Sequence, residues 1–252
     1  MEPTGGILKL DVFAISDLHL SLCQPINPGD WDQLNEYKPM AAIDGAWTNH
    51  ARRIYENWQT TVKPEDLVLV AGDISWAMDL AQAGPDLDYL GRLPGRIVAI
   101  KGNHDYWWHS VTRVRAVAPP NLSLIQNDCV RVGDLSICGT RGWLCPSGAY
   151  FQEADMRIYE RELIRLENSL RLAGDGEIIV MMHYMPTNEK HDKSGFIELM
   201  QKYRVTTAVF GHLHATACRS RLPERAWDIN FHLTSADYLD FKPLLLRPNV
   251  VL

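Results

Sequence analysis

The chain has 252 residues, of which 46% are hydrophobic and 22% are charged, a composition typical of a globular protein that buries a core. Its formal net charge of −6 argues against non-specific attraction to nucleic acid or to an anionic membrane. Its five cysteines form no C-x-x-C pair, which predicts reduced thiols in a reducing compartment, and hence a cytoplasmic location.

In chain order, residues 1–6 lack the basic start and the apolar run of a signal peptide, and no later stretch is apolar over a membrane-spanning length. Seven apolar runs rich in β-branched residues follow, and several are continuous, which predicts strands covered on both faces. The fourth run contains Gly133-Asp134 and is predicted to be a hairpin. The runs are Leu10–Ile15, Leu67–Ala71, Arg96–Ile100, Val130–Cys138, Glu177–Met182, Val205–Phe210 and Trp227–Leu233.

Helical patterns separate these strands. A stripe of apolar residues at steps of three and four predicts a first helix, with Asp44 as its cap. Further helices are expected over residues 153–173 and 195–203, and residues 77–91 look helical but interrupted at Gly84-Pro85. Strands that alternate with helices predict a layered α/β protein with at least partly parallel sheets. The first stripe consists of Trp47, Ala51, Ile54 and Trp58.

The length fits one large domain better than two small ones, and no stretch has the composition of an interdomain linker. A single domain over residues 1–252 is therefore expected. Residues 21–45 (Ser21–Gly45) are irregular and rich in Pro, Gly, Asn and Trp. This segment is either an insertion over the functional site or a surface loop.

Five short motifs, each placed where a hydrophobic strand ends, carry side chains that bind metals. In an extended segment residues i and i+2 point the same way, so Asp17 and His19 can face one ion, as can His212 and His214. Ligands of α/β sheets collect outside the carboxyl ends of strands, so the five segments are expected to converge. The motifs are Asp17-Leu18-His19, Gly72-Asp73, Gly102-Asn103-His104-Asp105, His183 and Gly211-His212-Leu213-His214.

Together the motifs supply two carboxylates, an amide oxygen and four histidines, with His104 left over. This set suits two divalent cations that share a carboxylate, and its oxygen and imidazole donors favour Mn, Fe, Zn or similar ions. Two cations held close together generate hydroxide and bind a phosphate at neutral pH. Each motif is common by chance when taken alone, since a D-x-H or a G-D is ordinary turn chemistry, so the prediction depends on their joint occurrence.

The order D-x-H, G-D, G-N-H-D, H, G-H-x-H resembles the calcineurin-like metallophosphoesterase superfamily over residues 17–214. The resemblance implies an α/β (α+β) fold, a four-layer sandwich of two facing mixed β-sheets flanked by helices. It also implies a dinuclear metal-dependent phosphoesterase in which Asp73 bridges the two ions. The first ion would bind Asp17, His19, Asp73 and His214, and the second Asp73, Asn103, His183 and His212.

By the same resemblance, a hydroxide that bridges the metals attacks phosphorus in line, and His104 protonates the leaving group. The alternative is that His104 only caps the following helix. Many relatives carry an acid three residues after the bridging aspartate, whereas this chain has Trp76 there. Asp105 and Asp79 are left as candidates to orient His104, and the missing acid counts against a protein phosphatase.

Two tryptophans and one arginine near the motifs are candidate substrate contacts. Trp107 and Trp108 either stack on a nucleobase or pack the ends of the sheet. Arg141, flanked by glycines after a strand, either binds a phosphate oxygen or ties a loop to a carboxylate.

These features favour the hydrolysis of a small phosphate ester, with a phosphodiester or nucleotide-like compound preferred and no membrane partner. A phosphomonoesterase, a nuclease and a catalytically silent scaffold are the alternatives. The acidic net charge and the lack of a basic stripe make nucleic acid an improbable partner. A scaffold should lack several ligands, whereas every ligand position is filled here.

Overall fold

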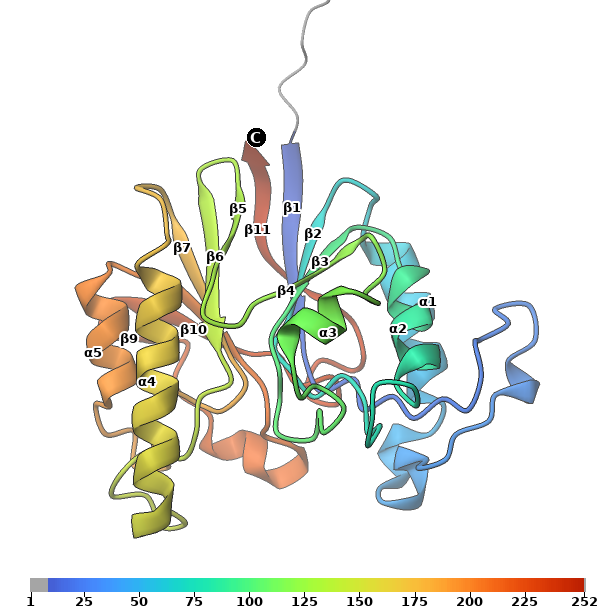
Figure 1. The fold of residues 1–252 in the computed structure, drawn as a ribbon, viewed down its shortest axis with the longest axis horizontal. Helices are drawn as coiled ribbons and strands as arrows, with labels where there is room; N and C mark the ends of the chain where they lie inside the picture. The colour runs from blue at the N-terminus through green and yellow to red at the C-terminus, as the bar shows by residue number, and fades with distance from the viewer. Residues whose placement is uncertain (1–8, 252) are drawn as a thin grey trace, which may run out of the picture.

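The computed structural model describes residues 9–251, so the expectation about residues 1–6 lies outside the described part. Two β-sheets face each other, and helices cover the outer side of each sheet (Figure 1). The five-stranded sheet contains, in spatial order, β11 (Leu244–Val251), β1 (Lys9–Ile15), β2 (Leu67–Val70), β3 (Arg96–Ala99) and β4 (Leu122–Leu124). The six-stranded sheet contains β5 (Val130–Val132), β6 (Leu135–Thr140), β7 (Ile178–Met182), β8 (Thr207–Phe210), β10 (Ile229–Leu233) and β9 (Arg225–Ala226).

Both sheets are mixed. Strands β1 to β4 pair in parallel, and β11 runs antiparallel to β1 at the edge. In the other sheet β6, β7, β8 and β10 are parallel, while β5 and β9 form antiparallel edges. The hairpin predicted around Gly133-Asp134 is confirmed as β5 and β6. Every residue of β2, β7 and β8 is buried, because each of these strands is covered on both faces.

Three apolar clusters divide the protein into four layers. The middle cluster joins the inner faces of the two sheets, with Leu69 from β2 in contact with the same core as Ile179 from β7 and Val209 from β8. On the outer side of the five-stranded sheet lie α1 (His50–Thr61), α2 (Gly84–Gly91) and α3 (Val111–Arg115). On the outer side of the six-stranded sheet lie α4 (Met156–Leu170) and α5 (Gly195–Lys202). The predicted α/β sandwich is confirmed.

The loops contain short 3-10 helices: η1 (Trp31–Gln33), η2 (Met40–Ala42), η3 (Gly45–Trp47), η4 (Glu153–Asp155) and η5 (Ala215–Ser220). Two predicted helix boundaries are wrong. Asp44 caps η3, where it accepts a hydrogen bond from the Ala46 N–H, whereas α1 begins at His50 after the left-handed Asn49. Gly84-Pro85 begins α2 instead of interrupting a helix, because proline fits the first helical turn without loss of a hydrogen bond.

None of the helices within residues 9–251 combines the length and the hydropathy that crossing a bilayer requires. All five cysteines are free thiols, as the sequence predicts. Cys138, Cys145 and Cys218 are buried. Their burial agrees with small apolar side chains in the core.

Candidate metal centre

The five motifs converge at one edge of the sandwich, outside the carboxyl ends of strands from both sheets. The five-stranded sheet contributes three loops and the six-stranded sheet contributes two, so the site lies across the junction of the sheets. This is the crevice in which α/β sheets bind ligands. The motif residues follow β1 (Asp17, His19), β2 (Asp73), β3 (Asn103, His104), β7 (His183) and β8 (His212, His214).

Four non-glycine motif residues have a left-handed backbone. The φ angles are 57° at Asp17, 47° at His19, 52° at Asp73 and 69° at His212. L-residues adopt this region rarely, and non-glycine residues that do so cluster at functional sites. Each turns the chain sharply as it leaves a strand, which aims the side chain across the end of the sheet.

The glycines of the motifs leave room for the carboxylates. A Cβ atom on Gly102 would lie 2.1 Å from Oδ1 of Asp73, and one on Gly211 would lie 2.2 Å from Oδ2 of Asp17. Any side chain at these positions would displace a carboxylate. The glycines are therefore needed for the close approach of neighbouring loops, which is a packing demand independent of their φ angles.

One group of ligand atoms is formed by Asp17, His19 and His214, whose donor atoms lie within 4.8 Å of one another. His214 Nε2 is 3.3 Å from Asp17 Oδ1. His19 Nε2 is 4.0 Å from Asp17 Oδ1 and 3.9 Å from Asp73 Oδ2, so Asp73 lies beside this group as well. These are the residues that the resemblance assigned to the first ion.

A second group is formed by Asp17, Asp73 and His183. His183 Nε2 is 3.3 Å from Asp73 Oδ2 and 2.7 Å from Asn103 Oδ1. His212 lies next to this group: its ring centroid is 5.1 Å from that of His183, and its backbone N–H donates to the Asp17 carboxylate. Asp17 belongs to both groups, and Asp73 lies beside the first group through His19 as well as in the second, so either carboxylate is close to both.

Further hydrogen bonds fix the orientation of two histidines. His214 Nδ1 is 2.9 Å from Oδ1 of Asp237, and His183 Nδ1 is 3.0 Å from the carbonyl oxygen of Ala71. Each leaves Nε2 facing the carboxylates, which is the usual arrangement of metal-binding imidazoles. Asp237 was not found by sequence reasoning. It follows β10, so its position after a strand was the one available signal.

Asp105 is fully buried and holds two motif loops together. Its carboxylate accepts hydrogen bonds from the backbone N–H groups of Asp73, Ile74, Ser75 and Gly102, at 2.7 to 3.1 Å, and from Trp107 Nε1. The loop after β2 and the loop after β3 are therefore fixed by one carboxylate. Asp105 is a positioning residue in this structure.

His104 lies at the rim of the site. Its backbone N–H donates to Asp73 Oδ1 at 2.8 Å, and its ring nitrogen Nδ1 lies 3.2 Å from the Tyr106 hydroxyl. Among the described residues, neither Asp105 nor Asp79 forms a hydrogen bond with the imidazole. The expected orienting acid is thus replaced by the Tyr106 hydroxyl, because Asp105 is occupied by the backbone of two loops.

Trp76, at the position of the missing acid, packs between the site and residues 21–45. Its ring is stacked on His19 with centroids 4.8 Å apart, and its centroid is 4.2 Å from that of His104. Lys38 Nζ lies 3.1 Å from the Trp76 centroid, and Trp76 Nε1 donates to Met40 Sδ. The 21–45 segment therefore reaches the metal centre through this tryptophan.

Burial and neighbouring charges shift the pKa values of the side chains in the two groups. Burial would raise the pKa of Asp73, but the charge of His183 and the hydrogen bond to it lower that pKa to about 2. Burial would lower the pKa of His183, yet Asp73 raises it to about 9. At His19 and His212 burial dominates and lowers the pKa to about 4 and about 3. The latter two rings are neutral at pH 7, the form that binds metals.

The donor set fits divalent metal ions. Carboxylate oxygens, one amide oxygen and imidazole nitrogens converge without a thiolate, a combination that suits Mn, Fe, Zn and similar ions. His19 Nδ1 is buried and has no hydrogen-bond partner among residues 9–251. Asp73 pairs with His183 and Asp17 pairs with His214, and a cation would take the place of the protons on these histidines.

None of the three candidate substrate contacts belongs to the two ligand groups. Trp107 and Trp108 are each 1% exposed, so neither ring has a free face for a base, and their burial agrees with the packing alternative. Arg141 lies behind the site: its carbonyl oxygen accepts hydrogen bonds from His183 and Tyr184 N–H, and its guanidinium is 3.7 Å from Glu162.

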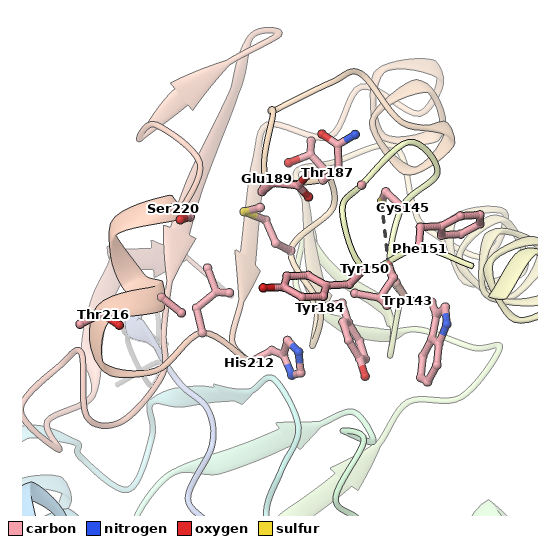
Figure 2. Close-up of a pocket in the computed structure, with 16 residues that line it drawn as sticks. Trp143, Cys145, Tyr150, Phe151, Tyr184, Thr187, Glu189, His212, Thr216 and Ser220 are labelled. Atoms are coloured by element: carbon pink, nitrogen blue, oxygen red, sulfur yellow. Dashed lines mark hydrogen bonds between the residues drawn. The ribbon is translucent and has the colours of Figure 1, made fainter. Parts of the chain in front are cut away.

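A cavity of about 480 Å³ opens beside His212 (Figure 2). Figure 2 shows Tyr184 next to His212, with Tyr150 and Trp143 close by. Aromatic and aliphatic side chains form most of the lining, and Thr187, Asn188 and Glu189 add polar groups. Apolar pockets with a few polar groups are typical sites for organic ligands.

A family model described as calcineurin-like phosphoesterase matches residues 10–216. The chain belongs to the calcineurin-like phosphoesterase family. Membership confirms the family expected from the motifs and indicates a metal-binding hydrolase. All the motif residues of this calcineurin-like phosphoesterase fall within the matched range.

Two solved structures share the fold at low sequence identity. One is a protein of unknown function from Aquifex aeolicus, with a TM-score of 0.52 and 15% identity, over 93% of this chain and 95% of that chain. The other is a phosphopantetheinyl hydrolase from Mycobacterium tuberculosis, with a TM-score of 0.52 and 15% identity, over 96% of each chain. No curated protein matches the sequence. At this identity the two likenesses bear on the fold of this chain alone.

Proposed function

We propose that this protein hydrolyses phosphate esters with two divalent cations at the metal centre. The observation that carries the proposal is the position of Asp73, whose carboxylate is 3.3 Å from His183 Nε2 and 3.9 Å from His19 Nε2. One ion would bind Asp17, His19, Asp73 and His214, and the other Asp73, Asn103, His183 and His212. Bound cations supply a hydroxide nucleophile at neutral pH and neutralise charge on the phosphoryl oxygens.

The remaining chemistry belongs to side chains at the rim. His104 would protonate the leaving oxygen, since its backbone is tied to Asp73 while its ring lies at the partly exposed edge of the site. Burial lowers the pKa of His104, and a bound phosphate dianion would raise that pKa again. The Tyr106 hydroxyl would orient the ring, and Asp105 would keep the two motif loops in register.

The cavity beside His212 supports a substrate with a sizeable organic group. Its volume of about 480 Å³ and its aromatic lining suit the second ester arm of a phosphodiester or a nucleotide-like group. One structural neighbour is called a phosphopantetheinyl hydrolase, so a phosphopantetheinyl ester is a reasonable test substrate. A phosphomonoesterase is the alternative, and the comparison of esters below separates the two.

The test is metal-dependent release of 4-nitrophenol from bis(4-nitrophenyl) phosphate and from 4-nitrophenyl phosphate. Protein loaded with Mn²⁺, Fe²⁺ or Zn²⁺ should turn over at least one ester, and the ratio of rates distinguishes diesterase from monoesterase. Asp73→Ala should bind neither ion tightly, because one carboxylate serves both sites. Silence on both esters and on a phosphopantetheinyl ester, with two ions bound per chain, would favour the scaffold alternative.

A further inference from the structure

A second cavity, of about 180 Å³, lies behind the metal centre and is lined by basic side chains. Lys101 comes from the loop after β3, Arg141 from the end of β6, and Arg161 and Arg165 from α4. The one acidic side chain in the lining is Glu162. Four cations and one carboxylate give the lining a net charge of +3, in a chain whose own net charge is −6.

Buried Glu162 organises these arginines without neutralising them. Its side chain is 0% exposed, and Oε1 lies 2.9 Å from Arg165, 3.4 Å from Arg161 and 3.7 Å from Arg141. Its other oxygen accepts a hydrogen bond from Thr140 at 2.6 Å. One carboxylate shared among three guanidinium groups leaves most of their donors without an anionic partner.

Two buried hydrogen-bond donors without a partner in the described part of the chain belong to residues that line this cavity. Arg141 Nε and Trp108 Nε1 are buried and have no hydrogen-bond partner among residues 9–251, and both side chains line the cavity. Both groups only donate, so an acceptor would satisfy them. Lys101 and three arginines bring positive charges close together around the cavity. An anion in the cavity would offset this crowding of positive charge.

The cavity adjoins the proposed catalytic site through the backbone. Lys101 is two residues before the ligand Asn103, and the carbonyl oxygen of Arg141 accepts the His183 N–H at 3.0 Å. The volume of the cavity is several times the roughly 30 Å³ that a water molecule occupies, so a carboxylate or a phosphate group fits. Guanidinium groups are the preferred partners of both anions.

We propose that this cavity is an oxyanion site that binds a phosphate or carboxylate group next to the metal centre. The oxyanion is either a second charged group of the substrate, an assignment that rests on the proposed function, or a separate anion. The site itself requires no bound metal.

Titration calorimetry of the metal-free full chain with sodium sulfate tests the site without reference to catalysis. Arg161→Gln and Arg165→Gln should each weaken sulfate binding by about tenfold, since each removes a charged hydrogen-bond donor. Arg157→Gln is the matched control, because Arg157 lies on the same helix, is exposed and does not line the cavity. Equal melting temperatures would show that the variants fold. No sulfate binding by the wild type, or equal binding by Arg157→Gln and Arg161→Gln, would overturn the proposal.

Kinetics of the metal-loaded enzyme then identify the source of the oxyanion. If the substrate carries it, Arg161→Gln should lose about tenfold more in kcat/KM on adenosine 3′,5′-bisphosphate than on adenosine 5′-monophosphate. If it is a separate anion, the losses should be equal, and added sulfate should change the wild-type rate more than the variant rate. Sulfate binding without turnover of any ester would count against the proposed function and leave the oxyanion site standing.

Discussion

Two polar contacts hold His104: its backbone N–H donates to Asp73, and its ring contacts the Tyr106 hydroxyl. The backbone contact couples the imidazole to the carboxylate that both ions would share, while the ring remains at the rim. A side chain placed in this way can act on the leaving group without contributing to ligation.

His104→Ala should therefore keep its metals and lose rate. A general acid contributes about 10²–10⁴ in rate, and the loss should be steepest for esters with poor leaving groups, which depend most on protonation. Metal analysis combined with a series of aryl phosphates of rising leaving-group pKa measures both effects. An equal loss across the series would contradict the role of proton donor.

A similar argument applies to Asp237, which lies behind His214 and fixes its ring. Asp237→Asn should weaken the binding of one ion by about 10–100-fold, because the amide holds the imidazole less firmly and makes it a poorer donor. Calorimetric titration with Mn²⁺ or Zn²⁺ measures the change. Asp240→Asn, three residues further along and exposed, should bind metal as the wild type does.

At the scale of elements, Asp86 joins three parts of the fold. It lies in α2, is fully buried, accepts a hydrogen bond from the Leu22 N–H at 2.9 Å, and is also bonded by the Ser75 hydroxyl. Leu22 belongs to the 21–45 segment, and Ser75 belongs to the loop that carries Asp73. One carboxyl group thus connects a helix, the 21–45 segment and the loop that carries Asp73.

Burial raises the pKa of Asp86 to about 7, whereas an aspartate in the unfolded chain titrates near 3.9. Between these values the folded protein keeps a proton that the unfolded chain has released. Stability from this group is complete below about pH 4 and is lost as the pH rises to about 7, at up to about 1.4 kcal/mol per pH unit.

Asp86→Asn should remove this slope, and urea unfolding at pH 5, 6, 7 and 8 measures the difference from the wild type. Asp88→Asn provides the control, since Asp88 is on the same helix but partly exposed beside Arg92. A wild-type free energy of unfolding that varies with pH in parallel with that of Asp86→Asn would contradict the prediction.

The strands that the sequence predicted and those that it missed differ in burial. Continuous apolar runs identified β2 and β7, in which every residue is buried. The strands missed were β11, an edge strand with mixed exposure and a proline at position 248, and the short strands β4 and β9, of three and two residues. None of the three has enough consecutive buried residues to produce a pattern.

At the candidate metal centre, too, some residues could be predicted from the sequence and others could not. The predicted ligands lie directly after strands, where sequence order predicts spatial convergence, and the structure brings Asp17, Asp73 and His183 together. The roles of Tyr106 and of Arg165 could not be predicted, because they depend on how a loop folds back and on which face of α4 packs against β6. Motif spacing carries no information on such contacts.

For the whole molecule, the decisive feature is that candidate ligands follow strands of both sheets. Asp73 follows a strand of the five-stranded sheet and His183 follows one of the six-stranded sheet, so bound cations would join the two halves of the sandwich. A ligand that binds only the folded state stabilises it by about 2.7 kcal/mol at a concentration 100 times its Kd.

Chelation should accordingly lower the melting temperature of the wild type by about 5 °C or more, the shift expected for such an energy in a protein of this size. Calorimetry with and without EDTA gives the value. Asp73→Ala should not respond to EDTA. Val209→Ala, in the core between the sheets, should lose stability to the same extent in both conditions. A wild type that is indifferent to EDTA would contradict cross-linking of the sheets by metal.

The left-handed backbone at Asp17, Asp73 and His212 restricts what directed evolution can try there. Aspartate, asparagine and histidine are among the few side chains that tolerate this conformation, and they are also metal donors. A glutamate would keep the charge but disfavour the turn, and an alanine would lose both. Libraries that aim to change the ion preference are best limited at these positions to asparagine, aspartate, histidine and glycine.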